Sequence, residues 1–165
     1  MKFSSITSEF FDLYIEDSDE ILHNKDENRP YLIIVKLEYK NIKHDFALPL
    51  RSNLANYTPK DQFFSLPPSR TTKKNKVHGI HYIKMFPVIN KYLKKFHYDK
   101  DNFYSLIHKI VLKNKNRIIN EAQKYLDDYE TGVRIQYSSN IDRIFMAIYF
   151  SEVLEEVAVA VDMAE

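Results

Sequence analysis

The stretch YLIIVKLEYKNIKHDFALPLRSNL, residues 31–54, predicts a β-hairpin. Its first nine residues are apolar and β-branched, which is typical of a buried strand. A polar turn follows, and residues 45–50 return as the second arm of a hairpin. This arm runs directly into Arg51, Ser52 and Asn53, so the sequence predicts a strand whose end presents three polar side chains.

Strands are also predicted on either side of this hairpin. Residues 1–6 read as a short opening strand, followed by a helix for which Ser8 is the predicted N-cap. Residues 79–89 read as a further strand, opened by a glycine. Between the hairpin and that strand, residues 51–78 are predicted to form a long loop, and loops of this length are usually functional or mobile.

The period of the apolar residues changes in the second half of the chain. Over residues 103–129 they recur at three- and four-residue steps, which predicts a long amphipathic helix with a break near 114–116. Gly132 is expected to stop it. Residues 144–150 fit either a strand or the start of a helix, and residues 151–165 predict a C-terminal helix capped by its first residue, a serine. Strands first and helices later indicate an α+β fold with a mainly antiparallel sheet.

The composition limits the class of protein. A chain of 165 residues fits one domain, so residues 1–165 are expected to form a single unit, and a hydrophobic fraction of 44% excludes a disordered chain. No run approaches the roughly 18 apolar residues that a membrane span needs, and the N-terminus lacks the apolar stretch of a signal peptide. The absence of cysteine excludes disulfides and thiolate metal sites. A cytoplasmic location without a membrane partner is the simplest expectation.

A net charge of +1 conceals an uneven distribution of charge. Residues 1–28 carry eight acidic residues against two lysines, whereas residues 70–117 carry thirteen basic residues against two aspartates. A basic segment in a nearly neutral chain suggests a polyanionic partner, although a solvated lysine-rich face remains an open alternative. Tyrosine and phenylalanine residues are interspersed among these lysines, and aromatic residues beside cations suit single-stranded nucleic acid.

The six histidines give no motif for a metal site. His78 and His81 flank Gly79 and Ile80, but no carboxylate lies nearby in the sequence to complete a shell of ligands, so no metal and no cofactor are expected. An imidazole titrates near neutral pH, which keeps both histidines as candidates for general acid or base. Residues three apart on a strand point to opposite faces, so at most one of the two is expected in the same cleft.

Five segments of the chain resemble, in the same order, the endoribonuclease toxins of type III toxin–antitoxin and abortive phage-defence systems, the ToxN/AbiQ family with its CptN and TenpN relatives. Each segment alone is a weak signal, but the order and spacing are specific, and the likeness covers most of the chain. The segments are MKFSSITSEFFDLY (1–14), RPYLIIVKLEY (29–39), FALPLRSNL (46–54), VHGIHYIKMFPVI (77–89) and YFSEVLEE (149–156).

The resemblance implies a compact, strongly bent antiparallel sheet with surrounding helices, like the MazF/Kid ribonuclease toxins. It implies metal-independent cleavage of cellular or phage RNA in the cytoplasm, through attack of the 2′-hydroxyl to give 2′,3′-cyclic phosphate and 5′-hydroxyl ends. It also implies an antitoxin RNA partner. This small, repeated, pseudoknotted RNA is cut by the toxin from its precursor and then inhibits it, in an RNA-mediated hetero-oligomer.

The resemblance places the catalytic residues at Arg51, Ser52 and Lys84. Arg51 offers a charged planar fork for phosphate oxygens and Ser52 a hydroxyl donor, while Asn53 is expected to hold a phosphate or a base edge. The best-known branch of the family has Thr-Ser followed by a lysine two residues on, where this chain has Arg51, Ser52 and Leu54. The cationic side chain of this segment is therefore expected at Arg51, and not at the position of Leu54. From the residues alone, a strand running into a polar turn explains the same stretch.

Further residues are expected to bind RNA. Arg29 and Tyr31 border the cleft, although packing is an alternative for the tyrosine, and a solvent-facing strand position is an alternative for Lys84. The basic residues of the loop grip the RNA backbone or keep the loop solvated, and three basic residues spaced by four form one stripe on the long helix. The expected RNA-binding set is Arg29, Tyr31, Asn53, Lys73, Lys74, Lys76, His78, His81, Lys109, Lys113 and Arg117.

Two other functions remain open at this point. The same basic surface suits a non-catalytic RNA-binding module. The acidic N-terminal segment alternatively suits a protein-interaction domain that docks a partner through its first helix.

Overall fold

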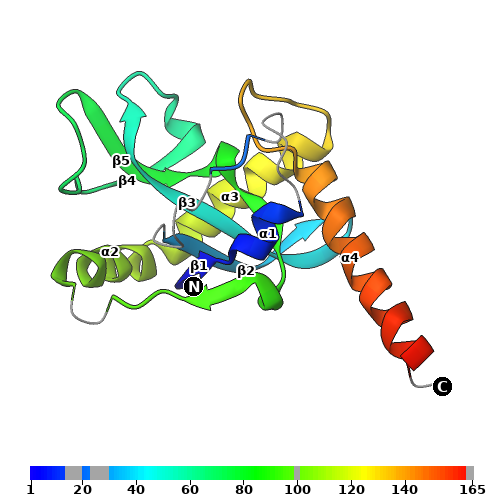
Figure 1. Cartoon of the computed structure of the whole chain (residues 1–165). Coiled ribbons are helices and arrows are strands. Elements are labelled where there is room, and N and C mark those ends of the chain that lie inside the picture. The colour runs from blue at the N-terminus through cyan, green and yellow to red at the C-terminus, as the bar shows by residue number, and fades with distance from the viewer. Residues whose placement is uncertain (14–19, 23–29, 99–100, 163–165) are drawn as a thin grey trace.

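The structure, a computed structural model, describes residues 1–13, 20–22, 30–98 and 101–162, the side chains of 33–35 and 154–162 excepted. These residues form an α+β fold in which helices surround one antiparallel sheet (Figure 1). The strands are β1 (Lys2–Ile6), β2 (Tyr31–Tyr39), β3 (Ile42–Ala55), β4 (Phe63–Leu66), β5 (Lys76–His81), β6 (Phe86–Val88) and β7 (Leu93–Lys95). The helices are α1 (Ser8–Asp12), α2 (Asn102–Lys113), α3 (Lys115–Glu130) and α4 (Ile141–Asp162).

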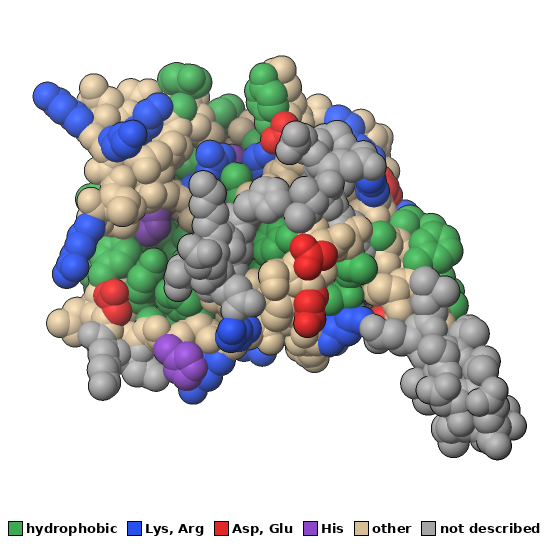
Figure 2. Space-filling view, in the orientation of Figure 1, with side chains coloured by type: hydrophobic (Ala, Val, Ile, Leu, Met, Phe, Trp, Pro, Cys, Tyr) green, Lys and Arg blue, Asp and Glu red, His purple; other side chains and the backbone are tan. Residues whose placement is uncertain are grey.

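Strand β3 is the centre of the sheet. The strand order is β4-β5-β3-β2-β1-β7, with β6 paired to β3 as well. One half of β3 pairs with β2, where Phe46 lies opposite Ile34, and the other half pairs with β5, where Arg51 lies opposite Gly79. The predicted α+β class with a mainly antiparallel sheet is therefore confirmed. In the orientation of Figure 1, Lys and Arg side chains project from the β4–β5 end of the molecule (Figure 2).

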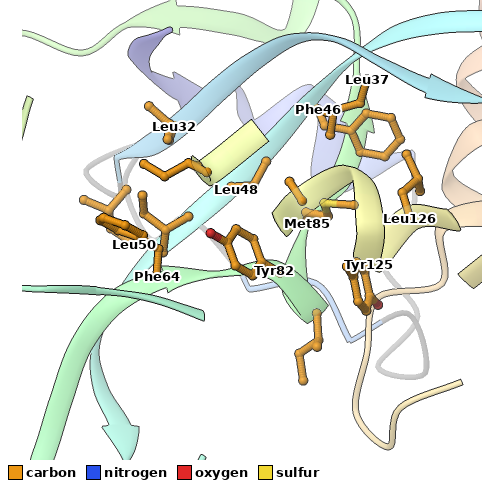
Figure 3. Close-up of a cluster of buried hydrophobic side chains, with 14 of the residues drawn as sticks. Leu32, Leu37, Phe46, Leu48, Leu50, Phe64, Tyr82, Met85, Tyr125 and Leu126 are labelled. Atoms are coloured by element: carbon orange, nitrogen blue, oxygen red, sulfur yellow. The ribbon is translucent and has the colours of Figure 1, made fainter. Parts of the chain in front are cut away.

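Hydrophobic residues pack on both faces of the sheet because side chains alternate along β3. Phe46 and Leu48 belong to a core cluster that includes α3 residues such as Leu126, and Ala47 belongs to a second cluster that includes Ile144 of α4. Figure 3 shows the first cluster, in which side chains of β3, of the turn after β5 and of α3 converge. No helix in the described part of the chain is long and apolar enough to cross a membrane.

The predicted continuous loop over residues 51–78 is wrong, because parts of three strands lie within it. Strand β3 continues to Ala55, β4 follows a short 3₁₀ turn, and β5 begins at Lys76. The reason is that Phe63, Phe64 and Leu66 are buried, so a run of only four residues builds a strand inside a polar stretch. Residues 67–75 are the loop that remains between β4 and β5.

The predicted strand over residues 79–89 is divided in two. A 3₁₀ turn at residues 82–84 separates β5 from β6, so Lys84 lies in a turn and not in a strand. In the second half, the predicted helix break is confirmed between α2 and α3, where the Asn114 Nδ2 atom donates to the Ile110 carbonyl at 2.8 Å. Residues 144–150 belong to α4, so Ser151 lies inside that helix and does not cap it. The N-cap of α1 is Thr7 and not Ser8.

Gly79 permits the close approach of β4 to β5. A Cβ atom at this position would lie 2.5 Å from the Phe64 carbonyl oxygen and 2.8 Å from a ring carbon of Phe63. We expect Gly79→Ala to lower the free energy of unfolding by about 1–3 kcal/mol, because a backbone atom of the neighbouring strand has to move. Urea unfolding measures the loss. Gly132→Ala is the control: its Cβ would meet no atom within 4 Å, and only the φ of +94° opposes it. A Gly79→Ala variant as stable as the wild type would show that β4 does not limit the space at this position.

Candidate functional site

A β-bulge in β3 sets the geometry of the candidate site. Arg51 lies opposite Gly79 and Leu54 opposite Val77, so Ser52 and Asn53 together oppose the single residue His78. An extra residue of this kind bends a strand and redirects its side chains. The prediction that Arg51, Ser52 and Asn53 lie at the end of a strand is therefore wrong. They lie within β3, half-buried between the buried Leu50 and Leu54.

The bulge opens into a cleft with a volume of about 540 Å³. Arg51, Ser52, Asn53 and His78 line one part of it, so the structure brings together four of the predicted site residues. Figure 2 shows hydrophobic side chains and a histidine on the surface between the β4–β5 end and α2. The remaining lining comes from the 20–22 segment, the residue before β2, β3 itself, the β4–β5 loop and the start of α2: Leu22, Pro30, Leu50, Ser69, Arg70, Thr71, Asp101, Phe103 and Tyr104.

The buried His81 side chain contacts Arg51 and orients its guanidinium. Their Nη1 and Nδ1 atoms are 3.3 Å apart, and His81 is buried, with 4% of its surface exposed. Burial, with the charges of Arg51 and Lys84, lowers the pKa of His81 to about 3. Since a guanidinium only donates, Nδ1 of the neutral ring accepts and the proton resides on Nε2. His81 is thus an orienting group for Arg51.

The buried, neutral state of His81 predicts a dependence of stability on pH. Its pKa in the unfolded chain is near 6.5, so between about pH 6.5 and pH 3 the unfolded chain binds the extra proton. The free energy of unfolding falls by up to about 1.4 kcal/mol per pH unit as the pH drops through this range. Urea unfolding at pH 7.5 and about pH 5 measures the slope. His81→Gln, which keeps an acceptor for Arg51, should flatten it, and an unchanged slope would contradict this assignment.

Lys84 is buried, with 5% of its side chain exposed, and it does not line the cleft. Its Nζ atom donates to the Glu20 carboxylate at 2.6 Å and to the Glu20 carbonyl at 2.8 Å. Burial lowers the pKa of Lys84, whereas the bond to Glu20 raises it. The alternative of a solvent-facing lysine is therefore wrong. The ammonium lies close enough to Arg51 and His81 to affect the electrostatics of both.

His78 presents a fixed tautomer to the cleft. Its Nδ1 atom lies 2.6 Å from the Pro67 carbonyl oxygen, which only accepts, so Nδ1 carries the proton and Nε2 keeps its lone pair. Burial lowers the pKa of His78, with an opposing contribution from the bond to Pro67. The ring packs beside Phe103, with centroids 5.8 Å apart. Of the two histidines, His78 lines the cleft and His81 does not.

Asn53 and Tyr31 form hydrogen bonds to two segments that line the cleft, the β4–β5 loop and residues 20–22. The Asn53 side chain donates to the Thr71 carbonyl at 3.0 Å and accepts from the Lys73 amide at 2.8 Å, which fixes the β4–β5 loop. Tyr31 is fully buried and its hydroxyl donates to the Leu22 carbonyl at 2.5 Å, so it packs beneath the rim. Arg29 lies outside the described residues.

The predicted basic stripe is not continuous. Lys109 and Lys113 are exposed on α2, but Arg117 lies on α3, beyond the break at Asn114. Arg117 is also engaged, because its Nε atom donates to Glu121 at 2.7 Å and its guanidinium lies over the Phe64 ring. A stripe along a single helix is therefore wrong. Lys73, Lys74 and Lys76 are exposed in the β4–β5 loop and at the start of β5.

The start of α2 contributes cleft residues that the sequence analysis missed. Asp101 caps the helix by accepting from the amides of Phe103 and Tyr104, and all three residues line the cleft. An aspartate before a helix is a typical N-cap, but no sequence pattern indicates that this end of α2 lies beside β3. Among the residues that the structure describes, no three His, Asp or Glu side chains form a group suited to a metal ion.

Comparisons with known proteins identify the fold. No protein-family model and no curated protein matches the chain. A solved protein of a bacterial antiviral system regulated by a processed non-coding RNA shares the fold with a TM-score of 0.65 and 16% identity, over 88% of this chain and 96% of that one. AbiQ, a lactococcal anti-phage endoribonuclease of a type III toxin–antitoxin system, matches with a TM-score of 0.63 and 16% identity, over 92% and 98%.

A third solved structure comes from a bacterial type III system in which a non-coding RNA pseudoknot selectively inhibits the toxin. It has a TM-score of 0.57 and 23% identity, and the match covers 88% of each chain. At these identities the likeness establishes the fold and not the activity. The fold that the sequence resemblance implied is thereby confirmed.

Proposed function

We propose that this protein is the endoribonuclease toxin of a type III toxin–antitoxin system. Its fold is that of three solved proteins from such RNA-regulated or anti-phage systems. The observation that carries the proposal is the bulge in β3, which places a cation, a hydroxyl and a neutral imidazole in one cleft: Arg51, Ser52 and His78. These groups suit cleavage of RNA by its own 2′-hydroxyl, without a metal ion.

Arg51 and Ser52 bind the scissile phosphate in this proposal. One guanidinium nitrogen of Arg51 lies 3.3 Å from His81 Nδ1, and a guanidinium is a planar, charged fork whose geometry suits phosphate oxygens. Ser52 Oγ accepts from Asn53 Nδ2 at 3.2 Å, so its own proton remains to donate to a phosphate oxygen. Charge that grows on the phosphate during the reaction meets donors that are already oriented. Lys84 interacts electrostatically with Arg51, and its own charge is paired with the Glu20 carboxylate at 2.6 Å.

His78 is the proposed general base. Its Nε2 atom takes the proton of the 2′-hydroxyl while the 2′-oxygen attacks phosphorus. The bond between phosphorus and the 5′-oxygen breaks, and that oxygen takes a proton from solvent. The products are a 2′,3′-cyclic phosphate and a 5′-hydroxyl. The bond from Nδ1 to Pro67 keeps the imidazole in the tautomer that this step needs.

The proposed partner is a repeated, pseudoknotted antitoxin RNA, which the toxin cuts from its precursor and which then inhibits it in an RNA-mediated hetero-oligomer. The proposed substrates are cellular and phage RNAs in the cytoplasm. Exposed lysines of the β4–β5 loop and of α2 lie on elements that also line the cleft, and they suit contacts to an RNA backbone.

Expression in bacteria tests the proposal in cells. We expect the wild-type chain to arrest growth, Arg51→Ala to abolish the arrest, and an RNA transcribed from tandem repeats beside the gene to restore growth. Equal amounts of both proteins on an immunoblot would show that growth of the variant does not result from a lower protein level. Arrest by Arg51→Ala, or failure of every adjacent repeat RNA to relieve it, would contradict the proposal.

A further inference from the structure

A second cavity lies at the other side of α2, where β1 meets β7. Its volume is about 450 Å³. Lysines and aromatic rings line it together, and none of its described lining residues is Asp or Glu: Lys2, Lys94, Lys95, Phe96 and Tyr98 are the members that matter here. Lys2 and Lys95 are exposed, and β7 is an edge strand of the sheet. This cavity is separate from the bulge in β3 and contributes nothing to the chemistry proposed above.

Tyr104 connects the lining of the cleft with that of the second cavity. It lines the cleft beside Phe103 and the bulge of β3. On its other side its ring packs edge-on against Phe96, with centroids 5.1 Å apart, and Phe96 lines the second cavity. The Phe96 and Tyr98 rings stack at 6.2 Å. A row of aromatic side chains therefore leads from His78 through Phe103, Tyr104 and Phe96 to Tyr98.

We infer that the second cavity is a subsite for the single-stranded RNA that flanks the cleaved bond. This inference rests on the proposed function and assigns part of the substrate to a separate surface. The strand passes from the cleft over the start of α2 to the edge of the sheet. One or two bases occupy the aromatic part of the second cavity, and Lys2 and Lys95 contact the phosphates on either side.

The chemistry of the lining favours RNA over an acidic peptide. An acidic peptide requires cations but gains nothing specific from a row of rings. A single-stranded nucleic acid uses both, because its bases stack on aromatic side chains while its phosphates follow the lysines. The arrangement also suits a chain that runs continuously, since Tyr104 of the cleft packs against Phe96 of the second cavity.

A binding measurement tests the subsite without interference from cleavage. The probe is a fluorescent 2′-O-methyl RNA of about 12 nucleotides, which lacks the attacking hydroxyl, and the readout is anisotropy over a series of salt concentrations. We expect Lys2→Ala/Lys95→Ala to weaken binding about tenfold and to reduce the slope of log K against log salt by about 1.4, as two phosphate contacts are lost. Phe96→Leu should weaken binding about tenfold through lost stacking.

The control is Lys43→Ala/Lys124→Ala, which removes the same charge from two exposed lysines that line neither cavity. It should bind as the wild type does, within twofold. In a parallel cleavage assay on unmodified RNA, Lys2→Ala/Lys95→Ala should raise KM about tenfold and leave kcat unchanged, because contacts to flanking nucleotides act equally on substrate and transition state. Thermal unfolding of each variant shows that it is folded.

Each outcome separates the subsite from the proposed function. RNA cleavage by the wild type with no effect of Lys2→Ala/Lys95→Ala and Phe96→Leu would overturn the subsite and leave the ribonuclease intact. Binding that both variants weaken, without any cleavage by the wild type, would support the subsite and overturn the ribonuclease. A competition experiment uses polyglutamate that carries the same charge as the RNA. If it displaces the RNA and binds with equal affinity, the cavity belongs to an acidic partner and the inference is overturned.

Discussion

Arg51→Ala is expected to lower the rate of RNA cleavage by about 10²- to 10³-fold, mostly in kcat. Arg51 lies in the cleft, and His81 holds one of its nitrogens at 3.3 Å. Removal of the guanidinium takes away the oriented charge that meets the developing charge on the phosphate. Single-turnover cleavage of a labelled RNA, with protein in excess, measures the effect on the chemical step.

Two comparisons isolate the part that geometry plays at this position. Arg51→Lys keeps a positive charge but loses the planar fork, so its rate should lie between those of Arg51→Ala and the wild type. Urea unfolding at pH 7.5 should show that both variants are folded. Arg51→Ala protein that is folded and cleaves at the wild-type rate would move the phosphate site away from the bulge of β3.

His78→Ala is expected to lower kcat by about 10²- to 10⁴-fold, the range for loss of a general base. Because burial lowers the pKa of His78, the ring stays unprotonated below the usual histidine pKa, and the wild-type rate should hold in mildly acidic solution. The rate should then fall as acid protonates Nε2. A pH–rate profile measures this, and the acidic limb should be missing from the residual activity of His78→Ala.

A matched substitution distinguishes a lost base from a lost contact. His78→Gln can still donate to the Pro67 carbonyl and so preserve the loop, but it cannot accept the proton. It should be folded and as slow as His78→Ala. His97→Ala removes an exposed histidine outside the cleft and should leave the rate unchanged. An acidic limb that persists in His78→Gln would assign the base to another group.

The hairpin was predictable because its pattern is local. Residues 31–39 and 45–50 are strongly apolar and flank a polar turn, and the break between α2 and α3 carries its own signal in Asn114. The short strand β4 was not predictable in the same way. Only its burial against β5, at Phe63 and Phe64, distinguishes it from the polar residues around it.

The site was predictable in part. The resemblance and the polar triplet indicated Arg51, Ser52 and Asn53, but a bulge adds one residue to a strand without changing the composition of the stretch. The burial of Lys84 depends on Glu20, which lies 64 residues away in the sequence. The wall formed by Phe103 and Tyr104 likewise depends on how α2 packs beside the sheet, which no local pattern encodes.

An RNA cleavage assay with purified protein in EDTA, followed by chemical identification of the new ends, tests the proposed ribonuclease activity. The protein must first be freed of bound RNA and shown to be folded. The proposed mechanism predicts fragments with 2′,3′-cyclic phosphate and 5′-hydroxyl ends, produced by the wild type and lost in both Arg51→Ala and Ser52→Ala. Absence of cleavage under these conditions would contradict it and leave an RNA-binding module. Fragments with 5′-phosphate ends would contradict attack by the 2′-hydroxyl.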